Sequence, residues 1–242
     1  MNIIKRLAIN MGISRMLFFA VKCNLRKFAL QVGIVDYPNK LHVGCGDKHL
    51  NGFLNVDKRA TRATDICADC TRLEGLPSNH FSIIYANAFL EHLYKNDRVN
   101  FIKEIKRILK KNGVFMVLSI PDFMTVATFY LKGKPGVLTN NFDLKEVYRH
   151  THGDPEQFPT WWQEQLHKSL FDVNEVAMLL SESGFQNYQI FKYYDVGVKV
   201  PVCLGFVAFK KKKLCAVDEL KMLIKEVTAH VNLNSVKIIK KK

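Results

Sequence analysis

Leu41-His42-Val43-Gly44-Cys45-Gly46-Asp47 is the stretch that decides the fold, because in it a short apolar run leads directly into two glycines separated by one residue. Glycine has no Cβ, so a loop containing Gly44 and Gly46 can turn tightly and bring its backbone close to a ligand. A purely structural turn would contain the same pair of glycines. The stretch alone therefore predicts a strand that ends in a tight loop.

Two acidic residues follow at the ends of the next apolar runs. Asp57 closes Asn55-Val56-Asp57, and Asp69 follows Ile66-Cys67-Ala68. A carboxylate in the first position can accept hydrogen bonds from both ribose hydroxyls of an adenosine cofactor, and the second could contact the adenine. Loops at the carboxyl ends of neighbouring parallel strands form one crevice, so the glycine loop and both acids together predict a cofactor site.

The pattern after the turn at 36–39 alternates short apolar runs with helical segments, which indicates βαβ units and a mostly parallel sheet. We expect helices at 96–111 and 172–183, and seven strands at 41–43, 53–56, 65–68, 81–85, 114–120, 188–191 and 202–209. The gap from Gly46 to Phe53 is too short for a full crossover helix. The predicted fold is a Rossmann-like α/β domain with helices on both faces of the sheet and a shortened first crossover.

Three regions are expected along the chain. Residues 1–39 form a basic helical N-terminal extension, and residues 40–210 form the α/β domain. Within that domain, residues 121–171 have no clear period and are rich in aromatic residues and histidines, so we expect an insertion over the mouth of the site. Lysine runs suggest that the folded domain ends near residue 210, which leaves 211–242 as a basic C-terminal tail, helical in part.

The formal net charge of +14 is concentrated at the two ends of the 242-residue chain. Residues 41–209 carry nineteen basic and eighteen acidic side chains, whereas residues 1–40 carry seven and one, and residues 210–242 carry ten and three. Basic ends on a neutral body suit an anionic membrane surface, nucleic acid or an acidic partner. They are equally consistent with solvated tails.

The six cysteines show no disulfide framework, and we expect neither a membrane span nor a secretory leader. These features favour a cytoplasmic location. The amphipathic pattern near the N-terminus adds peripheral membrane attachment as an alternative. The oligomeric state is not predicted.

Taken together, the motifs resemble class I S-adenosylmethionine-dependent methyltransferases over roughly residues 40–210. The resemblance rests on 41–46, Asn55-Val56-Asp57, Ala68-Asp69, Leu76-Pro77, 81–85, Phe89-Leu90-Glu91-His92-Leu93 and 109–113. Within that class, 120–123 and 167–172 are similar to a bacterial subgroup often associated with cell-surface polysaccharide synthesis. Departures from the family pattern are the missing third glycine of the first loop, Ser82 in place of an aspartate, and Lys111-Asn112 in place of Pro-Gly.

The resemblance implies S-adenosylmethionine as the cofactor and assigns its contacts. Gly44, Cys45 and Gly46 would lie against the methionine part, Asp57 would bind the ribose, Asp69 and the backbone of Cys70 would bind the adenine, and Asn87 would line the methionine side. The protein's main task would then be to align the acceptor with the methyl group.

A hydroxyl acceptor also needs a base, and a histidine suits this role near neutral pH. His167 and His92 are the candidate catalytic residues, although His92 could instead be a structural residue bonded to neighbouring backbone. His150-Thr151-His152 and the pair Cys67 and Cys70 resemble halves of metal sites. Neither has a second pair at zinc spacing, so no metal site is predicted.

The sequence thus predicts methyl transfer from S-adenosylmethionine to a small or glycan-linked acceptor, at oxygen. One alternative is an RNA or protein methyltransferase that uses the basic ends. Another is a non-catalytic, methyltransferase-like module that acts at a membrane or as a scaffold. A dehydrogenase is disfavoured, because the pyrophosphate of a dinucleotide needs the N-terminus of a full crossover helix.

Overall fold

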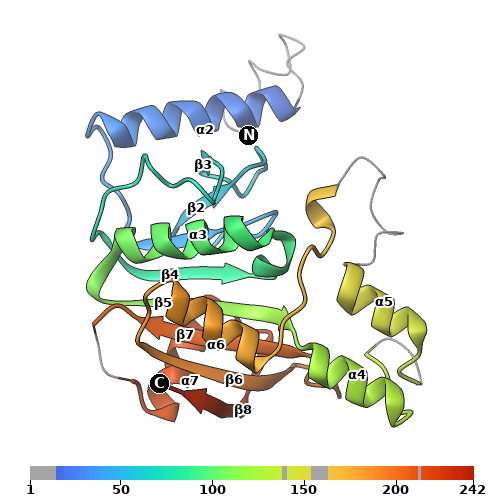
Figure 1. Cartoon of the computed structure of the whole chain (residues 1–242). Coiled ribbons are helices and arrows are strands. Elements are labelled where there is room, and N and C mark those ends of the chain that lie inside the picture. Colours follow the sequence, from blue (N-terminus) through green and yellow to red (C-terminus); the bar gives the residue numbers. More distant parts are fainter. Residues whose placement is uncertain (1–14, 138–140, 154–162, 212–213) are drawn as a thin grey trace.

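The fold is built on one central sheet (Figure 1). The computed structural model describes residues 15–137, 141–153, 163–211 and 214–242, and within them the sheet has eight strands in the order β3-β2-β1-β4-β5-β7-β6-β8. The strands are β1 Lys40–Val43, β2 Leu54–Asp57, β3 Ile66–Cys67, β4 Phe81–Asn87, β5 Leu109–Pro121, β6 Asn187–Asp195, β7 Cys203–Phe209 and β8 Val231–Lys241. β1 to β5 run parallel, and β7 lies antiparallel between β5 and β6.

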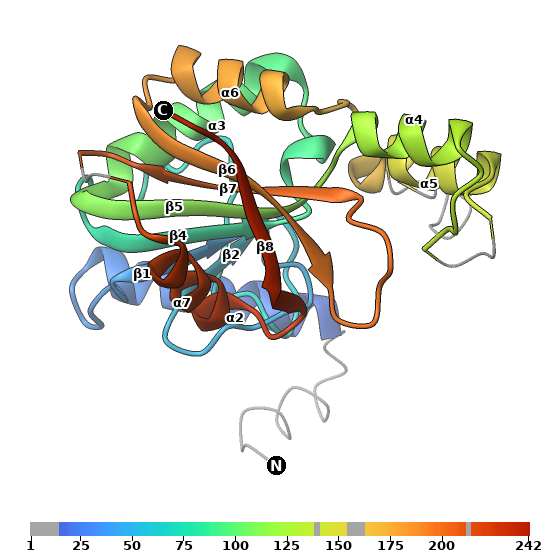
Figure 2. The same ribbon diagram turned by 90° about the horizontal axis from the view of Figure 1, so that it is seen from below.

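Helices cover both faces of this sheet, as Figure 2 shows. α3 Lys95–Ile108 and α6 Val173–Glu182 pack on one face, and α7 Val217–Val227 packs on the other. α2 Arg15–Gln31 lies beside β3. The predicted class, a Rossmann-like and mostly parallel α/β sheet with helices on both faces, is confirmed, with one strand more than predicted.

The expectation that residues 211–242 lie outside the folded domain is wrong for the described part of this region. α7 and β8 belong to the core: Leu220 and Ile224 are fully buried, and β8 pairs antiparallel with β6. Apolar residues recur at helical spacing in α7, which is the helix expected somewhere in this region. The dense lysines of β8 concealed its strand pattern, since lysine is depleted in strands.

The helix predicted at 96–111 ends earlier, at Ile108, because the chain is already extended at Leu109. Leu109 pairs with Phe81, and β4 and β5 then shift register between Phe81 and Ile83. Lysines at 110 and 111 are good helix formers and extended the predicted helix. The pairing of the buried Leu109 with Phe81 in the sheet outweighs that helix propensity.

The N-terminal extension contains the predicted helix in its described part. Lys22 Nζ donates to the carbonyl of Thr64 at 3.2 Å, and the Arg26 guanidinium lies 3.5 Å from Asp65. These contacts hold α2 on the β3 side of the sheet. No helix within the described ranges is long and apolar enough to cross a membrane.

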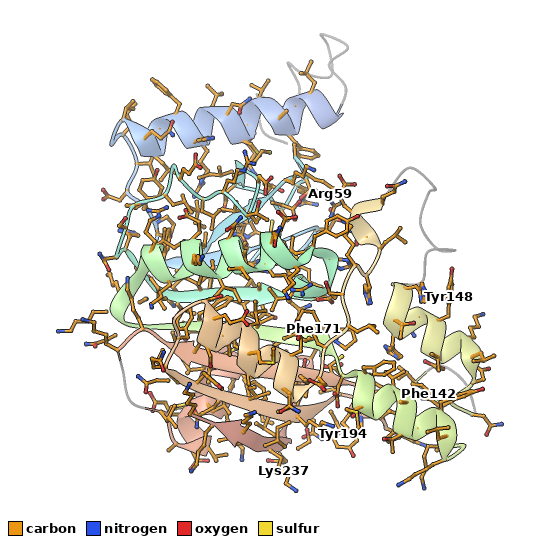
Figure 3. All side chains as sticks on the ribbon, viewed as in Figure 1. Arg59, Phe142, Tyr148, Phe171, Tyr194 and Lys237 are labelled. Carbon is orange, nitrogen blue, oxygen red and sulfur yellow. The ribbon has the colours of Figure 1, made fainter. Side chains whose placement is uncertain are left out.

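In its described residues, the insertion 121–171 contains the short helices α4 Phe123–Leu131 and α5 Leu144–His152 and the 3-10 turn η3 Gln163–Gln165. α4 and α5 pack on each other through a small apolar cluster that includes Val126 and Phe142. In Figure 3 the labelled Phe142 lies between these helices, to one side of the sheet. The insertion is therefore partly a small helical unit with its own core.

If α7 is integral to the domain, truncating its buried face must cost stability. We expect Ile224→Ala to lower the free energy of unfolding by about 2–4 kcal/mol, because it leaves a cavity in the core. Urea unfolding followed by circular dichroism measures this change. Met222→Ala, at an exposed position of the same helix, is the control and should change stability by less than about 0.5 kcal/mol. Equal effects of the two substitutions would mean that α7 is not packed as described.

Candidate functional site

The predicted cofactor residues lie at adjacent strand ends on one edge of the sheet. Gly44, Cys45 and Gly46 follow β1, Asp57 ends β2, Asp69 and Cys70 follow β3, and Asn87 ends β4. These strands are parallel neighbours in the order β3-β2-β1-β4, so their carboxyl ends share that edge. The sequence could place these residues only on separate loops, and the fold brings the loops together.

The glycine loop is held tightly against the end of β2. Gly44 and Gly46 have φ angles of +65° and +55°, in the left-handed region that favours glycine. The Cys45 N–H donates to the carbonyl of Val56 at 3.1 Å, and the Gly46 N–H donates to Asp57 Oδ2 at 2.8 Å. The conformation of the loop thus depends on both glycines and on the carboxylate of Asp57.

Asp57 is positioned by backbone donors on both sides. Its Oδ2 accepts the Gly46 N–H, its Oδ1 accepts the Arg59 N–H at 2.8 Å, and Arg59 Nε lies 3.7 Å from Oδ1. Each carboxylate oxygen has two acceptor sites, so the carboxylate can still accept hydrogen bonds from a ligand. Arg59 is labelled in Figure 3, beside the strand ends.

The side chains of Asp69, Cys45 and Cys70 at this edge differ in their exposure to solvent. Asp69 is exposed, and its Oδ1 accepts hydrogen bonds from the backbone N–H and hydroxyl of Thr71 at 2.9 and 2.7 Å. Cys45 and Cys70 are buried, and burial raises the pKa of both thiols, that of Cys45 to about 12. Their side chains therefore belong to the core, which leaves their backbone for contacts with a ligand.

A pocket of about 650 Å³ lies on the α7 face of the sheet. Of the predicted cofactor residues only Asn87 lines it, beside His42, Tyr85, Ser119, Tyr193 and His230. Asn87 Oδ1 accepts hydrogen bonds from Tyr85 at 3.2 Å and from Ser119 at 3.0 Å. The pocket thus adjoins the predicted cofactor edge at the end of β4.

Ser119 is a functional candidate that the sequence analysis missed. Its φ of +60° is unusual for a residue other than glycine, and it lies where β5 and β7 shift register, between Val117 and Ile120. Its N–H donates to the Tyr193 hydroxyl at 2.7 Å. Strained backbone of this kind gathers at functional sites. The sequence signal for it was a single polar residue in the otherwise apolar run 114–120.

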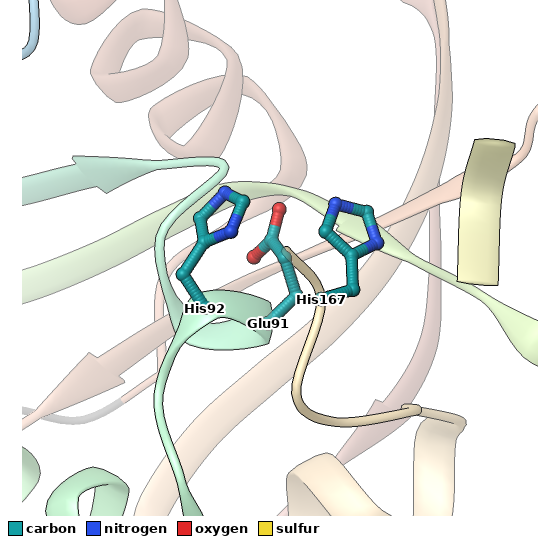
Figure 4. Close-up of side chains that lie close together, drawn as sticks. All are labelled: Glu91, His92 and His167. Atoms are coloured by element: carbon teal, nitrogen blue, oxygen red, sulfur yellow. The ribbon is translucent and has the colours of Figure 1, made fainter. Parts of the chain in front are cut away.

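A second cluster combines the two predicted catalytic histidines with an acid. Glu91 and His92 belong to the 3-10 turn η1 Leu90–His92 that follows β4, and His167 lies near the end of the insertion. Figure 4 shows the three side chains pointing toward one another. The two imidazole centroids are 5.1 Å apart, and the Lys168 N–H donates to the carbonyl of Glu91 at 2.7 Å, which ties the insertion to the turn.

Burial sets the protonation of this cluster. It raises the pKa of Glu91 to about 8 and lowers the pKa of His92 to about 4. Burial also lowers the pKa of His167. Both imidazoles are therefore neutral at pH 7, the state in which a histidine can accept a proton.

The remaining residues considered as ligands have structural partners. His150 and His152 lie on α5, not on a strand, and stack on Phe142 and Tyr148 respectively. They therefore do not form the strand-borne pair that their spacing suggested. In the other half-site, Cys70 Sγ donates to the carbonyls of Val56 and Ala68 at 3.9 and 3.8 Å, and the Cys67 thiol pairs with that of Cys23.

Comparisons with known proteins agree with the motif analysis. Residues 51–117 match the family model of the methyltransferase domain, and the sequence has no match among curated proteins. The family match supports the methyltransferase class and, with it, S-adenosylmethionine as the cofactor.

Several solved structures are similar in shape. One is a methyltransferase from Thermotoga maritima described as a possible histamine N-methyltransferase (14% identity, TM-score 0.46, covering 86% of this chain and 98% of that one). Another is an S-adenosylmethionine-dependent methyltransferase from Archaeoglobus fulgidus (13% identity, TM-score 0.48, covering 86% of this chain and 100% of that one). A third is the 1,6-didemethyltoxoflavin-N1-methyltransferase of Burkholderia thailandensis (14% identity, TM-score 0.46, covering 86% of this chain and 86% of that one). Similarity at this level says nothing about the acceptor.

The tight approach of the glycine loop to its surroundings gives a first test. A Cβ at Gly44 would collide with the ring of Phe89, whereas one at Gly52, also at positive φ, would meet nothing within 4 Å. We expect Gly52→Ala to cost about 1–2 kcal/mol of unfolding free energy, from backbone strain alone. Gly44→Ala should cost at least roughly 1 kcal/mol more, from the collision. Urea unfolding of both variants measures the difference, and equal costs would show that Phe89 moves aside freely.

His42 gives a test by pH. It is buried in β1, its Nδ1 lies 3.1 Å from Asn55 Oδ1, and burial lowers its pKa to about 4. The unfolded chain, with a histidine pKa near 6.5, binds the proton first. The stability tied to neutral His42 is therefore complete above about pH 6.5 and is lost as the pH falls toward 4.

From this group we expect a loss of about 2 kcal/mol in unfolding free energy between pH 7.5 and pH 5. His42→Gln can keep the bond to Asn55 and should lose correspondingly less over the same interval. His152→Gln, at an exposed histidine, is the control and should follow the wild type. The prediction fails if His42→Gln shows the full wild-type pH dependence.

Proposed function

We propose that this chain transfers a methyl group from S-adenosylmethionine to a hydroxyl of a small or glycan-linked acceptor. The observation that carries the proposal is the common edge of the sheet on which the glycine loop, Asp57, Asp69 and Asn87 meet. Directly after β4 on the same edge come the neutral His92 and its partner His167. A cofactor edge and an adjoining pair of bases are the two parts that hydroxyl methylation needs.

The residues at this edge fit an adenosine cofactor. A Cβ at Gly46 would approach only the end of the Arg59 side chain, at 3.5 Å, so the loop leaves space there. Asp57 is fixed by two backbone N–H groups and keeps acceptor capacity for the ribose hydroxyls. Asp69 is exposed, and Asn87 stands at the end of β4. These residues would hold the adenosine and methionine parts as the family resemblance implies.

S-adenosylmethionine, when bound, supplies a methyl group that is already reactive toward nucleophiles. The protein's own residues then orient the acceptor and remove its proton. His92 and His167 are the residues proposed for the proton, since both are neutral imidazoles near the cofactor edge. A hydroxyl acceptor gives these bases a use, and that favours transfer to oxygen.

The insertion 121–171 is the part of the chain that we expect to contact the acceptor. It supplies His167, and its Glu164 lies 3.3 Å from Lys58, the residue after Asp57. This ion pair is exposed and contributes little stability, but it places η3 next to the cofactor edge. The glycan-linked class of acceptor rests on the resemblance of 120–123 and 167–172 to the bacterial subgroup.

Calorimetric titration with S-adenosylhomocysteine tests the cofactor site. We expect micromolar binding by the wild type and a loss of at least tenfold in affinity for Asp57→Ala, which is about 1.4 kcal/mol. Asp47→Ala, at an exposed position of the same connection, is the matched control and should bind as the wild type does. Asp57→Asn keeps the size of the side chain and separates loss of charge from loss of loop structure. Absence of binding by folded wild-type protein would contradict the proposal.

A further inference from the structure

The cluster formed by Glu91, His92 and His167 has the composition of a metal site. One possible ligand atom from each residue lies within 4.8 Å of the other two. The residues come from two distant segments, the η1 turn and the end of the insertion, and their side chains converge between β4 and α5 (Figure 4). The sequence predicted no metal here, because the ligands have no motif spacing.

Glu91 is the first reason to look for a cation. Its side chain is buried, with a relative exposure of 1%, and its Oε2 has no hydrogen-bond partner among the described residues. A buried carboxylate is costly unless it is protonated, paired with a charge or bound to a metal. With its pKa raised to about 8, the Glu91 carboxyl is protonated at neutral pH in the metal-free protein, and a cation would bind in place of that proton.

The two histidines are oriented as metal ligands are. His92 Nδ1 lies 3.3 Å from the carbonyl of Leu166, and His167 Nδ1 lies 3.0 Å from the carbonyl of His150. A carbonyl can only accept a hydrogen bond, so Nδ1 of His167 carries the proton and its Nε2 keeps a lone pair. The His92 ring also hydrogen-bonds to the carbonyl of Ala88, so binding of an ion would displace one of its two carbonyl contacts. Metal-bound histidines are fixed in this way, by donation from the other ring nitrogen to a carbonyl or carboxylate.

We propose that Glu91, His92 and His167 bind a divalent transition-metal ion, and that Zn²⁺ is the ion this ligand set favours. Two imidazole nitrogens and one carboxylate are the ligands of several catalytic zinc sites, which keep a fourth position open. Mg²⁺ and Ca²⁺ prefer oxygen ligands throughout. One ion would bind the carboxylate and one ring nitrogen of each histidine together.

The geometry needs only a small closure. Ligand atoms at about 2.1 Å from a tetrahedral zinc ion are roughly 3.4 Å apart, and those of the cluster lie within 4.8 Å of one another, so they must approach by up to about 1.4 Å. Rotation of the side chains can provide this, since their backbones are already joined by the bond between Lys168 and Glu91. With the ion bound, the two histidines could not also accept the acceptor's proton, so the ion would replace them in that role. Its open position would take the oxygen of a hydroxyl-bearing ligand and lower the pKa of that hydroxyl, whose proton would pass to solvent. That role rests on the proposed methyl transfer, whereas metal binding itself does not.

Direct metal binding is the test. The full chain, freed of any affinity tag and stripped of metal with a chelator, is titrated with ZnCl₂ by calorimetry, and bound zinc is counted after dialysis. We expect one zinc per chain at micromolar affinity or tighter, and at least tenfold weaker binding by Glu91→Gln, His92→Asn and His167→Asn. His152→Gln, outside the cluster, is the control and should bind as the wild type does. Co²⁺ in place of Zn²⁺ should give a visible spectrum that the Glu91→Gln variant loses.

Glu91→Gln keeps the size of the side chain and replaces a carboxyl that is protonated at neutral pH with a neutral amide, so it should fold even where a histidine variant does not. Absence of zinc binding by folded wild-type protein overturns the inference, as does binding that none of the three substitutions weakens. Parallel titration with S-adenosylhomocysteine separates this inference from the proposed function. If the chain binds S-adenosylhomocysteine but not zinc, only the proposed metal site is overturned. If it binds zinc but not S-adenosylhomocysteine, only the proposed cofactor site is overturned.

Discussion

The short connection 44–53 between β1 and β2 is the constraint on which the rest of the structure depends. A crossover between parallel strands usually takes about a dozen residues or more and contains a helix, but this one contains only turns. The chain must therefore reverse at once after β1, which it does with Gly44 and Gly46 at positive φ. The carboxylate of Asp57 closes the loop, so a residue proposed for the ribose also maintains the turn.

The same constraint explains what covers the sheet. With no crossover helix after β1, one face of the sheet would be left without apolar cover, and α7 supplies it from the far end of the chain. Lys40 of β1 and Glu226 of α7 are joined by an ion pair at 2.5 Å, which marks this contact. α7 ends at Val227, and the pocket lies beyond that residue, between the strand ends and the turn before β8. The pocket is thus the part of this face that α7 leaves uncovered.

Local sequence patterns predicted most of the fold but could not predict that Glu91, His92 and His167 form one cluster. Buried parallel strands appear as short apolar runs, so seven of the strands were predicted, with errors of up to five residues at their ends, as at the start of β5. The loops proposed for the cofactor follow the ends of these strands. His92 and His167 were each identified singly, yet their meeting depends on the path of the insertion and on the bond between Lys168 and Glu91. No periodicity encodes that path. Ser119 was missed for a similar reason, since its role depends on Tyr193 from a strand far along the chain.

The eighth strand changes what the basic C-terminus does. β8 ends the strand order, and in the described residues no further strand pairs with its outer side. Such an edge offers free backbone groups to any other chain, and lysines are a common means of discouraging that pairing. Lys237, labelled in Figure 3, and Lys240 stand on this edge. Lysines on two copies would repel each other at this edge, over about 8 Å at physiological salt. We expect that repulsion to weaken in stronger salt and to leave the edge open to self-association.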